Sequence, residues 1–173
     1  MLVIGGLRRQ KHIETTIQAF KKASLERSVL RLVGENRDTE YERVIEKEIA
    51  GSPCVERINK RLQYEEFNDY MTKAHFTLFA DEKGKSSITN GTMMESLINY
   101  TPIIAPDYEP YTYYVKKYGI GLIYKPGDVE SYSETLIKAQ RLGSVSFIEN
   151  IGAFQNAIQF KIVANQLYNS ISF

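Results

Sequence analysis

The amino-acid sequence predicts an α/β fold: one doubly wound parallel sheet of about six strands with helices on both faces and a long C-terminal helical segment. Short apolar runs rich in β-branched residues alternate along the chain with segments whose apolar residues recur at helical spacing. A helix between consecutive strands returns the chain to the same end of the sheet, so strands connected in this way are parallel. The 173 residues are enough for one domain with its own core.

Six apolar runs are expected to be strands. Each is bounded by turn residues or by a helical segment. They are LVIG (2–5), VLRLVG (29–34), CVERI (54–58), HFTLFA (75–80), PIIAP (102–106) and GLIY (121–124).

Helices are expected between these strands. In segment 13–24, Ile13, Ile17 and Phe20 form one apolar stripe. Thr39 and Glu42 have the spacing of a capping box. The expected helices cover 13–24, 39–50, 64–74, 92–100, 108–118, a segment after the turn 126–128, and 146–171.

Composition argues against several classes of protein. Lys and Arg number 22 against 21 Asp and Glu, and a net charge of +1 gives no broad field to attract nucleic acid or an anionic membrane. Cys54 is the only cysteine, which excludes a disulfide within the chain. No run approaches the ~18 apolar residues of a membrane span. We expect a cytoplasmic protein. The chain looks like part of a longer enzyme, and peripheral association of that enzyme with the inner face of the membrane stays open.

Several short motifs fail on inspection. GKSS at 84–87 lacks the first glycine of a phosphate-binding loop, because that position is Phe79. GIG at 119–121 lacks the third glycine of a dinucleotide fingerprint and enters a strand. His12 and His75 are too few and too far apart to suggest a zinc site. We therefore expect neither a metal ion nor a cofactor.

A stronger candidate is the start of the helix at 92–100. Backbone amides of Asn90, Gly91 and Thr92 would be free to bind an anion such as a phosphate. Glu95 follows one turn later, where it could accept hydrogen bonds from vicinal sugar hydroxyls. It could equally stabilise the first helical turn through the dipole, by ~0.3 to 1 kcal/mol. Position alone leaves both readings open.

Four segments in register resemble one known family. MLVIGGLRRQKHIETTIQAF, LRLVGEN, GTMMESLINYTPIIA and GIGLIYKPGDVESYSETL are similar to the C-terminal half of group 1 (family 4-like) retaining glycosyltransferases of the GT-B fold. The resemblance runs from residue 2 to about residue 140 and implies that 1–173 is a Rossmann-like domain that binds a nucleotide-diphosphate sugar. Sugar would be transferred to an acceptor hydroxyl, in polysaccharide or glycoconjugate assembly. The N-terminal acceptor domain, which the resemblance implies as a partner, is absent from this sequence, so we expect the isolated chain to be inactive.

The resemblance also implies roles for particular residues. Lys11 matches the family lysine that neutralises the donor diphosphate, and Glu95 matches the glutamate that holds the ribose, so these two are the catalytic candidates. The loop near 60–62 matches the place where the family holds the nucleobase. The implied substrate-binding residues are Gly5, Gly6, Leu62, Ser87, Asn90, Gly91 and Thr92.

Two departures from the family pattern bear on function. Gly6 stands where the family has an arginine on the diphosphate, and Arg8 or Arg9 could take its place. Ser87 stands where the family has a first glutamate on the donor sugar, and Glu82 could compensate if the loop folds back. These departures keep open a second class of function, a non-catalytic nucleotide-binding or protein-interaction module on the same fold.

Overall fold

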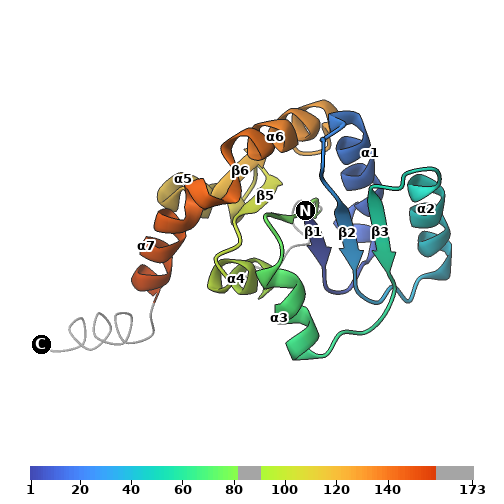
Figure 1. Ribbon diagram of the computed structural model, residues 1–173, viewed down its shortest axis with the longest axis horizontal. Coiled ribbons are helices and arrows are strands. Elements are labelled where there is room, and N and C mark those ends of the chain that lie inside the picture. The colour runs from blue at the N-terminus through green and yellow to red at the C-terminus, as the bar shows by residue number, and fades with distance from the viewer. Residues whose placement is uncertain (82–90, 159–173) are drawn as a thin grey trace, which may run out of the picture.

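A single six-stranded parallel sheet forms the centre of the protein, seen in a computed structural model that describes residues 1–81 and 91–158 (Figure 1). The strand order is β3-β2-β1-β4-β5-β6, so the chain winds outward from β1 and then outward again from β4. This confirms the predicted doubly wound α/β fold. The strands are β1 (Leu2–Ile4), β2 (Leu30–Val33), β3 (Val55–Ile58), β4 (Thr77–Leu78), β5 (Ile103–Pro106) and β6 (Gly121–Tyr124).

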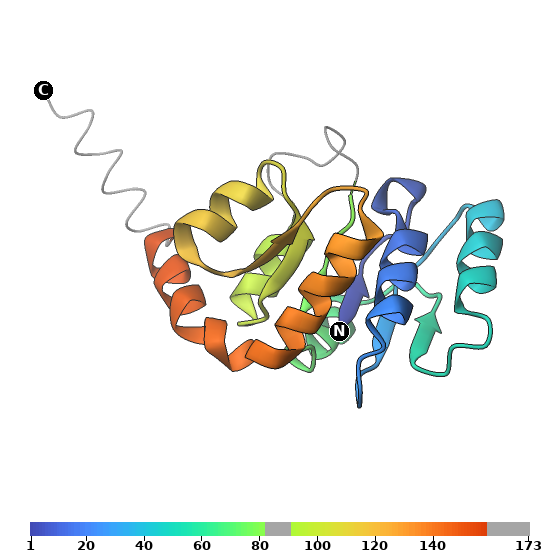
Figure 2. The same cartoon turned by 90° about the horizontal axis from the view of Figure 1, so that it is seen from above.

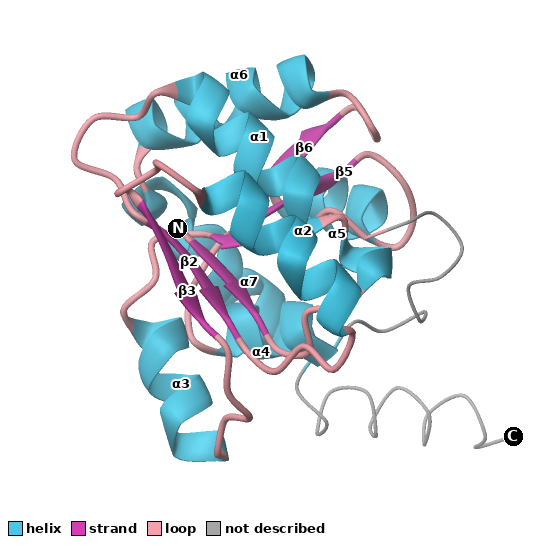
Figure 3. Cartoon of the chain, turned by 90° about the vertical axis from the view of Figure 1, so that its right-hand side faces the viewer, coloured by secondary structure: helices cyan, strands magenta, loops and turns pink. Residues whose placement is uncertain are grey.

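Helices cover both faces of the sheet (Figure 3). On one face α1, α2 and α6 lie side by side, and α1 packs along α6 (Figure 2). On the other face α3 covers a smaller apolar cluster formed by Leu2, Ile4, Val33 and Met71. The helices are α1 (Ile13–Ala23), α2 (Thr39–Ile49), α3 (Tyr64–Thr72), α4 (Gly91–Ile98), α5 (Tyr111–Tyr118), α6 (Val129–Leu142) and α7 (Ile148–Ile158), with short 3-10 turns η1 (Arg9–Lys11) and η2 (Ser144–Phe147).

The strand residues explain why both faces are covered. Val3 of β1 points to the cluster under α1, whereas its neighbours Leu2 and Ile4 point to the cluster under α3. All three are buried, as expected for a central parallel strand that reads as a continuous apolar run.

Three local expectations were wrong. Thr39 does not cap α2: Asp38 does, because its carboxylate accepts a hydrogen bond from the Tyr41 N–H at 2.9 Å. The closing helix is not continuous from 146, since Gly143, with a φ of 72°, ends α6 and η2 precedes α7. Residues 159–171 of the expected helix lie outside the described part. The strand expected at 75–80 pairs only over Thr77–Leu78.

Candidate functional site

A cleft of about 630 Å³ lies at the carboxyl ends of β1, β2 and β3. Open parallel sheets bind their ligands beyond this edge, where the strand order reverses, which in this protein is between β1 and β4. Predicted residues Gly5, Gly6 and Leu62 line the cleft.

Two glycines bring the backbone close together at the floor of the cleft. Gly34 follows β2 with a φ of 137°, and a Cβ atom there would lie 1.9 Å from the carbonyl oxygen of Gly5. No side chain fits at position 34, so the turns after β1 and β2 are in direct backbone contact.

Gly5 is also the meeting point of two predicted site residues. A Cβ atom at Gly5 would lie 3.6 Å from Lys11 Nζ and 3.6 Å from Thr92 Oγ1. These side chains come from η1 and from the start of α4, so β1, η1 and α4 converge at the switch point. An ammonium group beside a helix N-terminus favours an anion.

The environment of Lys11 is partly buried. Its Nζ donates a hydrogen bond to the carbonyl oxygen of Ile4 at 3.2 Å. Burial lowers the pKa of Lys11, and the positive charge of Arg8 adds to this, whereas the negative charge of Asp81 opposes it. A cation held in this way is desolvated, so it interacts more strongly with a bound anion than a surface lysine would.

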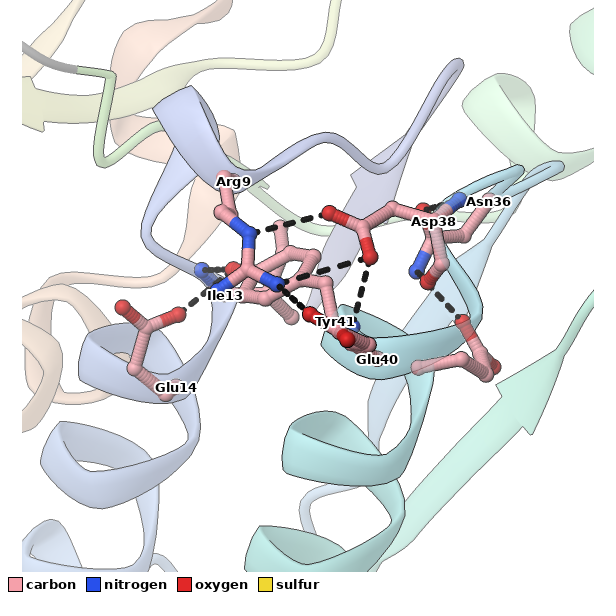
Figure 4. A network of polar contacts seen from close by, with 8 residues as sticks. Arg9, Ile13, Glu14, Asn36, Asp38, Glu40 and Tyr41 are labelled. Carbon is pink, nitrogen blue, oxygen red and sulfur yellow. Dashed lines mark hydrogen bonds and ion pairs between the residues drawn. The ribbon is translucent and has the colours of Figure 1, made fainter.

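A polar network fixes the segment that carries Lys11 (Figure 4). The hydroxyl of Tyr41 on α2 accepts a hydrogen bond from the Ile13 N–H at 2.8 Å and donates one to Glu14 at 2.5 Å. Arg9 lies over the Tyr41 ring, 5.3 Å from its centroid, and its Nε donates to Asp38 at 2.9 Å. The network therefore ties η1 and the start of α1 to the start of α2.

The two consecutive arginines have different partners. Arg9 pairs with Asp38 and Glu40 and also lines the cleft, and its replacement of the family arginine stays a prediction. Arg8 lines the cleft, and a Cβ atom at Gly6 would lie 3.6 Å from its Nε. Within residues 1–81 and 91–158, the Arg8 guanidinium makes no ion pair.

The other predicted site residues include Glu95 and residues outside the described part of the chain. Glu95 is half-buried one turn into α4, and its carboxylate makes no hydrogen bond or ion pair with another described residue. Ser87, Asn90 and Glu82 lie outside the described part of the chain. The expected contacts of these residues with a ligand stay predictions.

Sequence reasoning missed the environment of Asp81, the third residue after β4. The hydroxyl of Tyr108 donates to the Asp81 carbonyl oxygen and the hydroxyl of Tyr111 donates to the Asp81 carboxylate. His12, Asp81 and Tyr108 line a smaller hollow of about 270 Å³. An aspartate just beyond an expected strand was a usable signal, whereas no local pattern shows that Tyr108 and Tyr111 contact it.

Searches for metal and membrane features gave no candidates. No group of three or more His, Cys, Asp or Glu side chains is arranged to hold a metal ion among the described residues. None of the helices in that part of the chain combines the length and apolar character needed to cross a membrane.

The chain belongs to the family described as Glycosyl transferases group 1, whose pattern matches residues 1–144. This agrees with the resemblance found from the sequence segments. A comparison with curated proteins finds no match.

Solved structures share the fold. The C-terminal domain of a group 1 glycosyl transferase family protein, LpcC from Francisella tularensis, has a TM-score of 0.74 at 14% identity, covering 91% of this chain and 86% of that domain. Alr3699/HepE from Anabaena, solved with UDP, has a TM-score of 0.76 at 14% identity, covering 99% of this chain and 48% of HepE. WaaG, a glycosyltransferase of lipopolysaccharide biosynthesis, has a TM-score of 0.71 at 19% identity, covering 99% and 46%. This chain thus spans about half the length of HepE and WaaG.

Proposed function

We propose that this chain is the donor-binding domain of a retaining glycosyltransferase and holds a nucleotide-diphosphate sugar in the cleft. The observation that carries the proposal is the convergence of Lys11 Nζ and Thr92 Oγ1 on Gly5 at the switch point of the sheet. The complex of HepE with UDP supports the choice of ligand, since that protein has the same fold.

The charges at this point suit the departure of a nucleoside diphosphate. When the bond between the sugar and the diphosphate oxygen breaks, negative charge grows on the leaving group, the acceptor oxygen forms the new bond to the sugar, and the proton of the acceptor hydroxyl passes to the departing diphosphate. Lys11, Arg8 and the amides at the start of α4 would stabilise that charge without a metal ion. Glu95 would accept hydrogen bonds from the ribose hydroxyls, the role that the family resemblance implies.

The complete reaction requires a second part. We propose that the acceptor site belongs to an N-terminal domain or a separate subunit, because this chain corresponds to about half of HepE and WaaG. The isolated chain should bind the donor but not transfer its sugar. Robust transfer to a sugar acceptor by these 173 residues alone would contradict this.

Titration calorimetry with uridine, guanosine and adenosine diphosphates tests the donor site. We expect one nucleotide to bind, and Lys11→Met to weaken it by about 10- to 100-fold through loss of a charge-assisted contact. Arg8→Ala and Glu95→Ala should also weaken binding, and excess EDTA should leave it unchanged. Lys73→Met is a matched control, since Lys73 pairs with Asp69 on exposed α3.

The opposite result favours another function. If the folded protein binds none of the three nucleotides, the donor-binding proposal fails for the isolated chain. The departures at Gly6 and Ser87 would then favour a non-catalytic interaction module. Equal loss of affinity in Lys73→Met and Lys11→Met would show that binding is governed by net charge rather than by this site.

A further inference from the structure

A buried ion pair lies beneath the loops that form the cleft. Arg57 of β3 and Glu42 of α2 expose only 7% and 13% of their side chains. Arg57 Nε donates to one carboxylate oxygen at 2.8 Å and Nη2 donates to the other at 3.0 Å. Burial alone raises the pKa of Glu42, but hydrogen bonds from Arg57 and Asn36 outweigh it and hold the pKa below its usual value.

The third nitrogen of the same guanidinium binds the backbone where β2 and β3 end. Arg57 Nη1 lies 3.2 Å from the carbonyl oxygen of Leu32, 2.9 Å from that of Gly34 and 2.9 Å from that of Ile58. One side chain therefore joins the carboxyl ends of two neighbouring strands. Gly34 is also the residue whose backbone rests against Gly5.

Asn36 extends this network into the loops themselves. Its Nδ2 donates to Glu42 at 2.8 Å and to the carbonyl oxygen of Asp38 at 3.2 Å. Its backbone N–H donates to Asn59 Oδ1 at 3.1 Å, across to the loop after β3. The loops at 34–38 and 59–63 are thus tied together and to Arg57.

Both loops line the cleft. The first contributes Gly34 and Asn36, and the second contributes Leu62, which is followed by Phe67 of α3. Leu62 and Phe67 are half-buried against the apolar cluster under α3. Their apolar surfaces suit a flat nucleobase, whereas the cationic end near Gly5 suits a diphosphate.

A buried ion pair is weak evidence for stability, because well-packed apolar residues often serve as well. It does supply fixed directions, since a guanidinium is planar and its donors point along set lines. We propose that Arg57 is a positioning residue: held by Glu42, it sets the two loops at the spacing that accepts the nucleobase of the donor. This inference rests on the proposed function, and Arg57 itself does not line the cleft.

The ligand test separates the nucleobase from the diphosphate. In Arg57→Met, affinity for the nucleoside diphosphate that binds best should fall about tenfold or more, whereas affinity for inorganic pyrophosphate should stay within about twofold. Arg57→Lys should not restore binding, because an ammonium group cannot reach both the carboxylate and the carbonyl oxygens. Equal losses for both ligands, or no loss for either, would overturn the proposal.

The same two strands offer a matched control. Arg31 of β2 pairs with Glu56 of β3 at 2.7 Å, and both side chains are nearly half exposed. Arg31 lies one register step before Leu32, the partner of Arg57, and lines none of the cleft. Arg31→Met should change the affinity of neither ligand, and a loss like that of Arg57→Met would count against a specific role.

Hydrogen exchange tests, without any ligand, whether Arg57 holds the two loops together. In Arg57→Met, and in Glu42→Gln if the former does not fold, amides at 34–38 and 59–63 should exchange faster while those of β5 and β6 keep their protection. Unchanged exchange in these loops would overturn the inference whatever the nucleotide result. A wild-type protein that binds no nucleoside diphosphate would instead overturn the proposed function, so the two failures are distinct.

Discussion

Two buried tyrosines differ in one respect that mutation can isolate. Tyr41 and Tyr132 are 2% and 0% exposed. The Tyr41 hydroxyl accepts from the Ile13 N–H and donates to Glu14 (Figure 4). Within the part of the chain that the structure describes, the Tyr132 hydroxyl makes no hydrogen bond of normal geometry, although the side chains of Thr16 and Tyr124 lie near it. Replacing each by Phe removes one hydroxyl from a similarly buried ring.

The expected change in stability follows from the partners left behind. Tyr41→Phe leaves a buried N–H group and a carboxylate oxygen without this partner, which costs about 1 to 3 kcal/mol. For a chain of this length each kcal/mol lowers Tm by about 2 to 4 °C, so Tm should fall by about 2 to 12 °C. Tyr132→Phe loses no hydrogen bond of normal geometry and removes a desolvated hydroxyl, so Tm should stay the same or rise.

Thermal unfolding followed by circular dichroism, with urea titration to obtain the free energy of unfolding, measures both variants. Equal m-values in the three proteins would show that the denatured states are comparable. Equal destabilisation by the two substitutions would refute the reasoning, because it would mean that the network around Tyr41 contributes nothing beyond the buried ring.

The remaining predictions concern the phosphate end of the cleft. Gly34→Ala should destabilise the protein and abolish nucleotide binding, because its Cβ would lie 1.9 Å from the Gly5 carbonyl oxygen. Gly51→Ala is the control: Gly51 is also at positive φ, but a Cβ there would have no atom within 4 Å, so binding should stay intact. Thermal melts and titration calorimetry compare the two variants. Nucleotide affinity should fall as pH rises through the pKa of Lys11, which burial places below the ordinary 10.5, since the charged form binds the anion. Asp81→Asn removes the charge that supports the ammonium, so the same fall should occur at lower pH, and a midpoint that moves upward would contradict this.

The architecture was predictable because its signals are local and repeated. Each strand is an apolar run, because both faces of the sheet are covered by helices. The apolar stripes between these runs predict helices, and a helix between two strands connects them in parallel. Lys11 was predicted from the family resemblance and Thr92 from its place at the start of a helix, and both lie beside Gly5 in the structure. Their proximity depends on the strand order, in which β1 and β4 are neighbours.

The errors arose where adjacent residues compete or where a charge is buried. Asp38 and Thr39 are both good helix caps, and the sequence does not say which side chain faces the Tyr41 N–H. Nothing in the sequence pattern singles out Arg57, because its partners lie on a helix and on backbone groups that no local pattern reveals.

The shortness of β4 has a mechanical consequence. β1 and β4 share a single register pair, Leu2 with Thr77, whereas every other neighbouring pair of strands shares more. The sheet is therefore least reinforced along the seam where the phosphate end of the cleft lies, and packing of α1 on α6 bridges it on one face. An anion held between the turn at Gly5 and the start of α4 would link the two halves of the sheet across that seam. Donor binding should thus stiffen the domain from within, and protection of the β4 amides would record it.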